Sequence, residues 1–227
     1  RQMRSKGIPV FGSGLVFPVS EDDIICEDFD IPRHYPCIAA VDFGFDHPTA
    51  VSWVALDPDD DVMYVYDEYR RNKETPLTHA AVINARTPGL PVAFPHDGLQ
   101  LDKGSGVQLA QQYRDLGVYM LPEHFSNPPA DGMVKGNNSV EAGISELLQR
   151  FETGRLKIFR SCVETMEEMR LYHRKNGKVV PIKDDLLSAM RYAALSVERF
   201  GERQKSKAMF RKYGFDSEIE YSNAGVV

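Results

Sequence analysis

The sequence predicts a mixed α/β domain in which helices flank one central sheet. Three apolar segments joined by short turns indicate an antiparallel meander, and they cover 38–42, 50–56 and 62–69. A strand, a helix and a second strand follow over 90–121, which is the order of a parallel crossover. With 227 residues, of which 42% are hydrophobic, the chain can bury a sizeable core around such a sheet.

Turn and capping residues divide the rest of the chain into further elements. Pro76 suits the first turn of a helix, and Ser139 suits the N-cap of an amphipathic helix. The dipeptide Asn176-Gly177 predicts a hairpin over 172–180. Helices are expected at 76–87, 105–116, 139–151 and 162–171, and a last one begins at 184–185. Short strands are expected at 16–19, 118–121 and 156–159.

The composition argues against several classes of protein. No apolar run approaches the roughly 18–20 residues of a membrane span, and no signal peptide is visible. Cys26, Cys37 and Cys162 form no CxxC pair, which argues against structural zinc and favours a reduced, intracellular protein. The net charge of −6 argues against a nucleic-acid partner, but clustered carboxylates add negative charge that bound metal would offset.

Acidic residues stand where three predicted elements end or begin. Asp42 ends the first strand of the meander, Asp97 follows the apolar segment 90–94, and Asp184-Asp185 begins the last helix. If the two strands are parallel neighbours, Asp42 and Asp97 emerge at one edge of the sheet, where the helix needs only to start. Buried carboxylates are costly unless they bind something, and Mg²⁺ or Mn²⁺ takes oxygen ligands. The pattern predicts a site for two cations about 3.5–4 Å apart, which can activate water and stabilise the leaving oxygen of a phosphodiester.

Some of these acidic residues also have an ordinary structural explanation. Asp at a helix start is often an N-cap, but a cap uses only one of Asp184 and Asp185. The segment 57–61 contains four aspartates, yet it lacks the Gly and the distal Glu of an EF-hand. Its Asp-Pro pair is ordinary hairpin-turn chemistry, so we interpret this segment as a turn.

Residues beside the main carboxylates form a second group of candidates. Asp46 and His47 follow Asp42 within its turn, where a turn role is favoured over contact with metal-bound water. His96 precedes Asp97, and adjacent side chains of a strand point to opposite faces. We therefore expect His96 to be packed or hydrogen-bonded rather than a ligand. Asp102 and Lys103 lie on the loop after Asp97, near the predicted site.

Basic residues gather directly before the last helix and again in the C-terminal tail. A solvated turn and a surface that faces DNA phosphates are both compatible with the basic hairpin. The candidate phosphate contacts are Arg174, Lys175, Lys178 and Lys183. The tail, 201–227, is basic in its first half and is expected to be flexible or to contact nucleic acid.

Three motifs in this order resemble a known family. They are Asp42-Phe43-Gly44, Pro95-His96-Asp97-Gly98, and the stretch Asp184-Asp185-Leu186-Leu187-Ser188-Ala189-Met190-Arg191-Tyr192. The segments Lys6-Gly7-Ile8-Pro9 and Asn138-Ser139-Val140-Glu141-Ala142-Gly143-Ile144 also fit. Together they resemble the nuclease domain of tailed-phage terminase large subunits, in particular the headful-packaging, P22-like branch.

The resemblance implies an RNase H-like fold, similar to those of RuvC and integrases, and an endonuclease that uses two divalent cations, Mg²⁺ or Mn²⁺. Asp42 would bridge both cations, Asp97 would hold one, and Asp185 or Asp184 would complete the other site. Members of the family commonly have a further Asp where this chain has Ser188, which leaves the roles at the helix open. The enzyme would cut concatemeric double-stranded DNA when packaging starts and ends.

The resemblance also implies an arrangement of domains and partners. We expect an approach segment or linker over 1–37, the nuclease domain over 38–200 and the tail over 201–227. In this family an ATPase domain precedes the nuclease. Because the sequence contains no GxxxxGK[ST] motif and begins with Arg, we expect that domain to lie outside this fragment. Portal protein and small terminase subunit would be partners in the host cytoplasm during virion assembly, and the isolated domain is expected to be monomeric. The alternatives are a DNA-gripping or docking module that does not cut, and a related RNase H-like resolvase.

Overall fold

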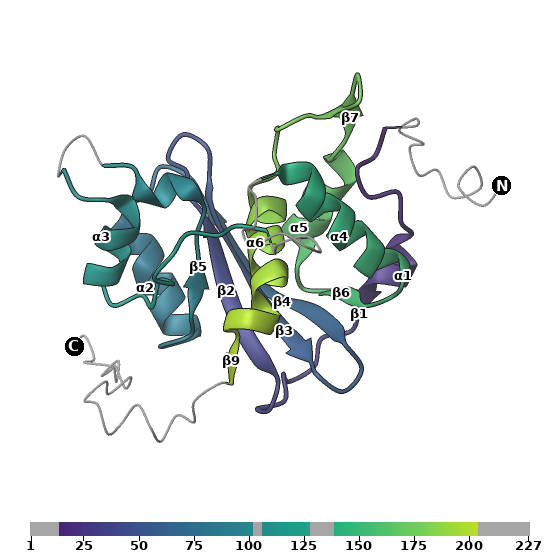
Figure 1. The fold of residues 1–227 in the computed structure, drawn as a ribbon, viewed down its shortest axis with the longest axis horizontal. Coiled ribbons are helices and arrows are strands. Elements are labelled where there is room, and N and C mark those ends of the chain that lie inside the picture. Colours follow the sequence, from purple (N-terminus) through teal and green to yellow (C-terminus); the bar gives the residue numbers. More distant parts are fainter. Residues whose placement is uncertain (1–13, 102–105, 128–138, 204–227) are drawn as a thin grey trace, which may run out of the picture.

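A mixed sheet runs through the middle of the computed structural model, which describes residues 14–101, 106–127 and 139–203 (Figure 1). The strand order is β1-β6-β4-β3-β2-β5, and β9 pairs with β2 as well. The strands of this sheet are β1 (Ile25–Cys26), β2 (Pro36–Asp42), β3 (Thr49–Asp57), β4 (Val62–Arg71), β5 (Val92–Ala93), β6 (Leu156–Phe159) and β9 (Glu202–Arg203).

The predicted meander and the parallel pairing are confirmed. Strand β3 runs antiparallel to both β2 and β4, with Asp42 opposite Ala50 at one end. Strand β5 lies parallel to β2, and β6 lies parallel to β4. The turn over 57–61 is confirmed too, because the Asp59 N–H donates to the Asp57 carboxylate within it. The carboxyl ends of β2 and β5 therefore point to the same edge of the sheet.

Helices cover both faces of the sheet, as Figure 1 shows, so that the domain has three layers. The helices of one face are α4 (Val140–Glu152), α5 (Val163–Leu171) and α6 (Asp185–Phe200). Those of the other face are α2 (Pro76–Arg86) and α3 (Leu109–Asp115). The remaining helical segments are α1 (Glu21–Ile24) and the 3₁₀ helix η1 (His96–Leu99).

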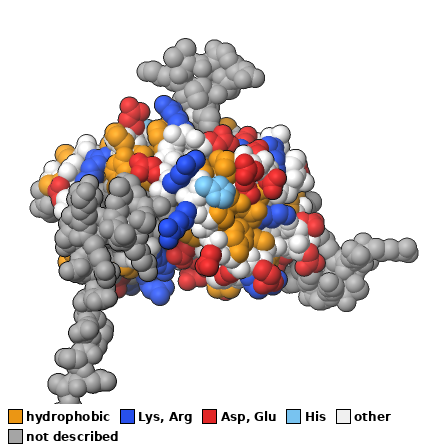
Figure 2. Space-filling view, turned by 90° about the horizontal axis from the view of Figure 1, so that it is seen from below, with side chains coloured by type: hydrophobic (Ala, Val, Ile, Leu, Met, Phe, Trp, Pro, Cys, Tyr) orange, Lys and Arg blue, Asp and Glu red, His pale blue; other side chains and the backbone are white. Residues whose placement is uncertain are grey.

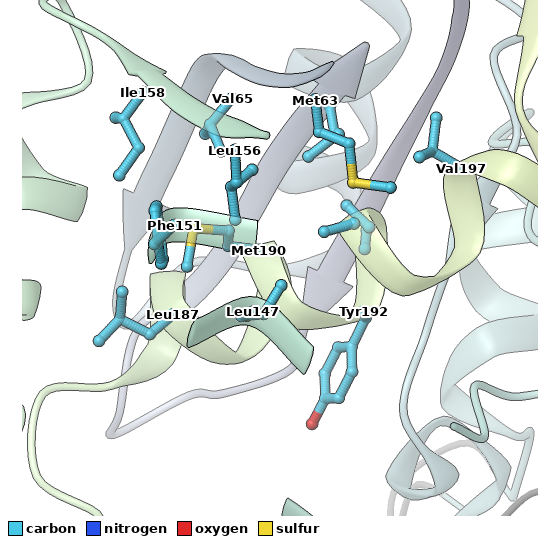
Figure 3. Close-up of a cluster of buried hydrophobic side chains, with 14 of the residues drawn as sticks. Met63, Val65, Leu147, Phe151, Leu156, Ile158, Leu187, Met190, Tyr192 and Val197 are labelled. Atoms are coloured by element: carbon cyan, nitrogen blue, oxygen red, sulfur yellow. The ribbon is translucent and has the colours of Figure 1, made fainter. Parts of the chain in front are cut away.

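The period of two along β2 divides its side chains between two cores. Ile38 and Ala40 belong to the core under α4, α5 and α6, whereas Ala39 and Val41 belong to the core under α2 and α3. Figure 3 shows the first core, where side chains of β4, β6, α4 and α6 meet. They include Met63, Val65, Leu147, Phe151, Leu156, Ile158, Leu187 and Met190. Asp42 is two residues after Ala40 and four after Ile38, so its side chain points to the same face of the sheet, which α6 covers.

Several boundaries differ from the prediction. The apolar segment 90–94 forms a strand only over β5, because η1 begins three residues later. The expected strand at 118–121 is a single parallel bridge between Met120 and Val92. Helix α3 begins at Leu109, whereas Ser105, where we expected its start, lies outside the described residues.

The described part of the expected linker packs into the domain. Val16, Phe17 and Ile24 are buried in the core under α4, α5 and α6. No strand forms at 16–19; instead, the Val16 N–H donates to the Tyr172 carbonyl oxygen. Strand β1, which the sequence analysis did not anticipate, pairs with β6. The division of the chain at residue 38 remains a prediction.

The predicted hairpin is present as β7 (Arg174–Lys175) and β8 (Lys178–Val179). Asn176 and Gly177 have φ values of 51° and 76°, which the two-residue turn of a hairpin requires.

Seen from the opposite end of the molecule, where β3 ends, acidic, basic and hydrophobic side chains are mixed on the surface (Figure 2). None of the helices in the described ranges is long and apolar enough to cross a membrane.

Candidate active site

Asp42 stands at the end of β2, held there by a closed loop. The Thr49 hydroxyl donates to the Gly44 carbonyl oxygen at 2.8 Å and accepts from the Gly44 N–H at 3.1 Å. A Cβ atom at Gly44 would lie 2.4 Å from the His47 carbonyl oxygen, so only glycine fits this tight turn. The loop therefore fixes where the strand ends and where the Asp42 carboxylate emerges. Asp46 and His47 are exposed on the same loop.

Asp97 reaches the same edge by a different route from the one predicted. It lies within η1, four residues after the end of β5, rather than at the end of the strand itself. It is exposed, and its carboxylate accepts a hydrogen bond from the Gln100 side chain at 3.1 Å. The His96 ring, which we expected to be packed or hydrogen-bonded, is exposed and lies edge-on to His124 with ring centres 5.0 Å apart.

Helix α6 packs across β2 and β3 and brings Asp184 and Asp185 to this edge. Asp184 occupies the N-cap position, but its side chain makes no capping hydrogen bond. The cap comes from α5 instead, where the Glu168 carboxylate accepts from the N–H groups of Leu186 and Leu187. Sequence reasoning missed Glu168, because nothing local signals a contact between residues 18 and 19 positions apart.

The other three aspartates are close enough to affect the ionisation of Asp42. Burial raises the pKa of Asp42 to about 8, and the charges of Asp185, Asp184 and Asp97 add to this effect. Burial likewise raises the pKa values of Asp184 and Asp185 above the ordinary range. Asp185 affects Asp42 more strongly than Asp184 does. The exposed His47 lowers the pKa values of Asp184 and Asp185, so it lies within electrostatic reach of the pair.

The donor set fits hard divalent cations, because it consists of carboxylate oxygens. Within the described ranges, no group of three or more His, Cys, Asp or Glu side chains is arranged so that it could hold a metal ion. Like charges favour separation of these carboxylates, and a cation between them would replace repulsion with attraction. Burial is the main reason that the pKa of Asp42 is raised, and this repulsion adds to it.

One buried cation lies beside the carboxylates, and sequence reasoning missed it as well. Arg191 on α6 is 6% exposed, and its charge lowers the pKa values of Asp42 and Asp184. Its guanidinium group lies over the Tyr192 ring, 4.7 Å from the centroid. Gly143 on α4 makes room for this side chain, since a Cβ atom there would lie 2.7 Å from the Arg191 Cδ atom.

The basic candidates have different surroundings. Arg174 pairs with both carboxylate oxygens of Glu141, at 2.6 and 2.7 Å, which occupies its guanidinium group. Lys175, Lys178 and Lys183 are exposed. Asp102, Lys103 and most of the basic tail lie outside the described residues.

Residues 39–196 match the family described as "Terminase RNaseH-like domain". The chain belongs to this terminase family. The large terminase subunits of Enterobacteria phage LP7 and Salmonella phage P22 are 43% and 41% identical to it over 193 and 206 residues. These alignments cover 85% and 90% of this chain but 39% and 40% of those proteins, so the chain spans about two fifths of their length.

Solved structures of terminases have the same fold. The P22 large terminase nuclease domain superposes with a TM-score of 0.76 at 41% identity, over 85% of this terminase domain and 96% of that chain. The large terminase nuclease of phage G20c with bound magnesium superposes with a TM-score of 0.56 over 81% of this domain and 97% of that chain. At 18% identity the G20c structure supports the fold alone. The predicted RNase H-like fold and the resemblance to P22-like terminases are thus confirmed.

Proposed function

We propose that this terminase domain is an endonuclease that hydrolyses phosphodiester bonds of double-stranded DNA with two divalent cations, Mg²⁺ or Mn²⁺. The observation that carries the proposal is the Asp42 carboxylate at the end of β2, whose ionisation is opposed first by its partial burial and then by the charges of Asp185, Asp184 and Asp97. The carboxylates that influence it come from η1 and from the start of α6. The P22 relative of known structure is a nuclease domain, and the G20c nuclease binds cobalt, magnesium and zinc.

We infer a role for each carboxylate from the resemblance to the terminase family. Asp42, at the end of β2, would serve as a ligand of both cations, Asp97 would hold one of them, and Asp185 would hold the other. Asp185 is preferred over Asp184 because its charge affects Asp42 more strongly. Arg191 supplies a fixed positive charge beside Asp42 and Asp184 on the buried side. Bound divalent cations would activate the attacking water and stabilise the leaving oxygen.

The biological setting is proposed from the relatives. As part of a large terminase subunit, the domain cuts concatemeric viral DNA when genome packaging starts and ends. It follows an ATPase domain in the same polypeptide and works with portal protein and small terminase subunit in the host cytoplasm. The identity of 41% to the P22 protein, of which this chain spans two fifths, supports this setting.

A plasmid-nicking assay tests the activity. With Mn²⁺ or Mg²⁺, the 227-residue chain should convert supercoiled DNA to nicked and linear forms. Asp42→Asn should lower the rate by more than the roughly 10–100-fold that loss of an outer-shell partner of a metal ligand costs. Asp46→Asn, an exposed carboxylate of the same loop, is the matched control and should keep the wild-type rate. Cleavage that survives Asp42→Asn rules out the proposed two-cation site.

The exposed lysines favour one second function, a module that grips DNA without cutting it. Lys175 and Lys178 project from the hairpin and Lys183 precedes the carboxylates, where they can contact phosphates in a sequence-independent way. If this alternative holds, the wild-type chain binds DNA but nicks no plasmid with any of the cations. A further RNase H-like alternative, a resolvase, predicts preferential cleavage of four-way junctions over linear duplex.

A further inference from the structure

The start of α6 is capped from outside the helix. The Glu168 Oε2 atom accepts from the Leu186 N–H at 2.8 Å and from the Leu187 N–H at 3.1 Å. Glu168 is 1% exposed, so these contacts are made away from water. A helix start leaves up to four N–H groups without partners, and a carboxylate is among their best acceptors. Glu168 thereby does what the side chain of an N-cap residue ordinarily does.

The Asp184 side chain is consequently not needed as the cap of this helix. Asp184 stands at the N-cap, where an Asp side chain would normally accept from the second or third N–H of the helix. Its side chain makes no such bond, and Glu168 receives the N–H groups instead. A carboxylate that accepts from backbone N–H groups has fewer lone pairs and less freedom to turn toward a cation.

Glu168 is itself held in place by Arg70 of β4. The Arg70 Nη1 atom donates to Glu168 Oε1 at 2.6 Å, and its Nε atom lies 3.0 Å from a Glu164 oxygen. One Glu168 oxygen therefore binds the sheet and the other binds α6. Because Asp42 lies on the same sheet, this connection fixes the start of α6 relative to it.

We propose that Glu168 is a positioning residue of the carboxylate site: by capping α6 in place of Asp184, it keeps Asp184 and Asp185 available to the cations. The inference rests on the proposed function. Loss of the Glu168 cap leaves the first N–H groups of α6 to the nearest carboxylates, which are Asp184 and Asp185. Cation affinity then falls although no ligand has been removed.

The chain offers a matched control for this idea. Glu68 of β4 caps α5 in the same way, accepting from the Glu164 N–H at 2.8 Å and from the Thr165 N–H at 2.7 Å. Both glutamates are thus carboxylate caps supplied from another element. Only the helix capped by Glu168 carries candidate cation ligands in its first turn. A variant of Glu68 therefore reports what loss of such a cap does when Glu168 itself is kept.

Calorimetric titration of the 227-residue chain with Mg²⁺, and with Mn²⁺, measures the effect without DNA. Glu168→Gln should raise the dissociation constant by about 10–100-fold, as loss of an outer-shell partner typically does. Glu68→Gln should change the dissociation constant less than about twofold, whereas both variants should lower the melting temperature. Glu168→Asp, which keeps the charge but is shorter, should give an intermediate affinity.

The proposal is overturned if Glu168→Gln lowers the melting temperature and leaves cation affinity unchanged. It is equally overturned if Glu68→Gln weakens binding as much as Glu168→Gln does, or if neither Glu168 variant folds, since Glu168 would then serve the general fold. The variant Asp42→Asn distinguishes failure of the role proposed for Glu168 from failure of the proposed function. If that variant binds cations like the wild type, the two-cation site itself is wrong; if it does not bind, only the role of Glu168 is in question.

Discussion

At the scale of a single residue, two effects disfavour the charged form of Asp42. Its position at the end of a buried strand removes water, and the neighbouring aspartates disfavour its charge, so its pKa is raised to about 8. A group whose pKa is higher in the folded state stabilises the fold at low pH. That stability is lost as pH rises from the ordinary value of 3.8 to about 8. The cation-free domain is therefore expected to become less stable as the solution is made alkaline.

Asp42→Asn removes this destabilising charge. In EDTA at pH 8 the variant should be more stable than the wild type by at least about 1.4 kcal/mol, the equivalent of one pKa unit. Added Mg²⁺ should raise the melting temperature of the wild type but not of the variant. Urea and thermal unfolding with and without Mg²⁺ measure both effects. A variant that is less stable than the wild type in EDTA would contradict the electrostatic argument.

Cation affinity should depend on pH in the opposite direction. A cation binds the ionised carboxylate, so it must displace the proton that Asp42 retains below a pKa of about 8. We expect affinity for Mg²⁺ to rise by up to about tenfold per pH unit between pH 6 and 8 and then to level off. Calorimetry in two buffers of different ionisation enthalpy gives the number of protons released. An affinity that does not change over this range would show that Asp42 is ionised without the cation.

At the scale of secondary structure, local pattern predicted most elements, and tertiary contacts decided the others. The meander, α4 with its Ser139 cap and the Asn176-Gly177 hairpin follow from periodicity and turn chemistry. Strand β1 has two residues, and its strand character comes from pairing with β6, far along the chain. Asp97 was expected at the end of a strand, but it lies in a 3₁₀ helix. This helix was not predicted because it is too short to show a hydrophobic periodicity in the sequence.

The same distinction applies to the candidate site. Asp42, Asp184 and Asp185 could be found because their own elements show where strands end and helices begin. Glu168 and Arg191 could not be found in this way, because their contacts are with residues of other elements. Glu168 accepts a hydrogen bond from the start of α6, and Arg191 packs against Gly143 of α4. A buried glutamate and a buried arginine on amphipathic helices resemble ordinary surface residues in the sequence alone.

The contact between α4 and α6 yields a prediction of its own. Gly143→Ala places a methyl group 2.7 Å from the Arg191 Cδ atom, so the arginine must move. Overpacking costs about 1–3 kcal/mol, against which a helical Gly→Ala change gains about 1 kcal/mol. Displacement of Arg191 should also raise the pKa of Asp42 further, because Arg191 lowers it. Because Arg191 repels a divalent cation more strongly than it repels a proton, cation affinity near pH 7 should nevertheless rise, as calorimetry can measure.

Ser145→Ala is the control for this change. It lies on the exposed side of α4, two residues farther along, and should leave cation affinity unchanged. If Gly143→Ala binds cations as tightly as the wild type at pH 7, the close approach of α4 to Arg191 has no part in the electrostatics of the site.

At the scale of the whole molecule, the carboxylates and the candidate DNA contacts lie toward one end of the sheet. The register places Asp42 opposite Ala50, and Ala50 opposite Arg70, at that end, whereas Met63 pairs with Leu156 at the other. A net charge of −6 thus coexists with exposed lysines beside the candidate site. Bound cations would offset part of the negative charge where the DNA backbone has to approach.

The double change Lys175→Ala/Lys178→Ala should accordingly weaken binding to DNA of any sequence. Each phosphate contact contributes about 0.9 to the slope of log affinity against log salt, so loss of two contacts should lower that slope by about 1.8. Fluorescence anisotropy with a labelled duplex in Ca²⁺, measured over a range of salt concentrations, gives the slope. Lys157→Ala is the control, because Lys157 pairs with Tyr64 at the opposite end of the sheet and donates to the Asp23 carbonyl oxygen. If the control lowers the slope as much as the double change does, DNA binds over the whole surface rather than beside the carboxylates.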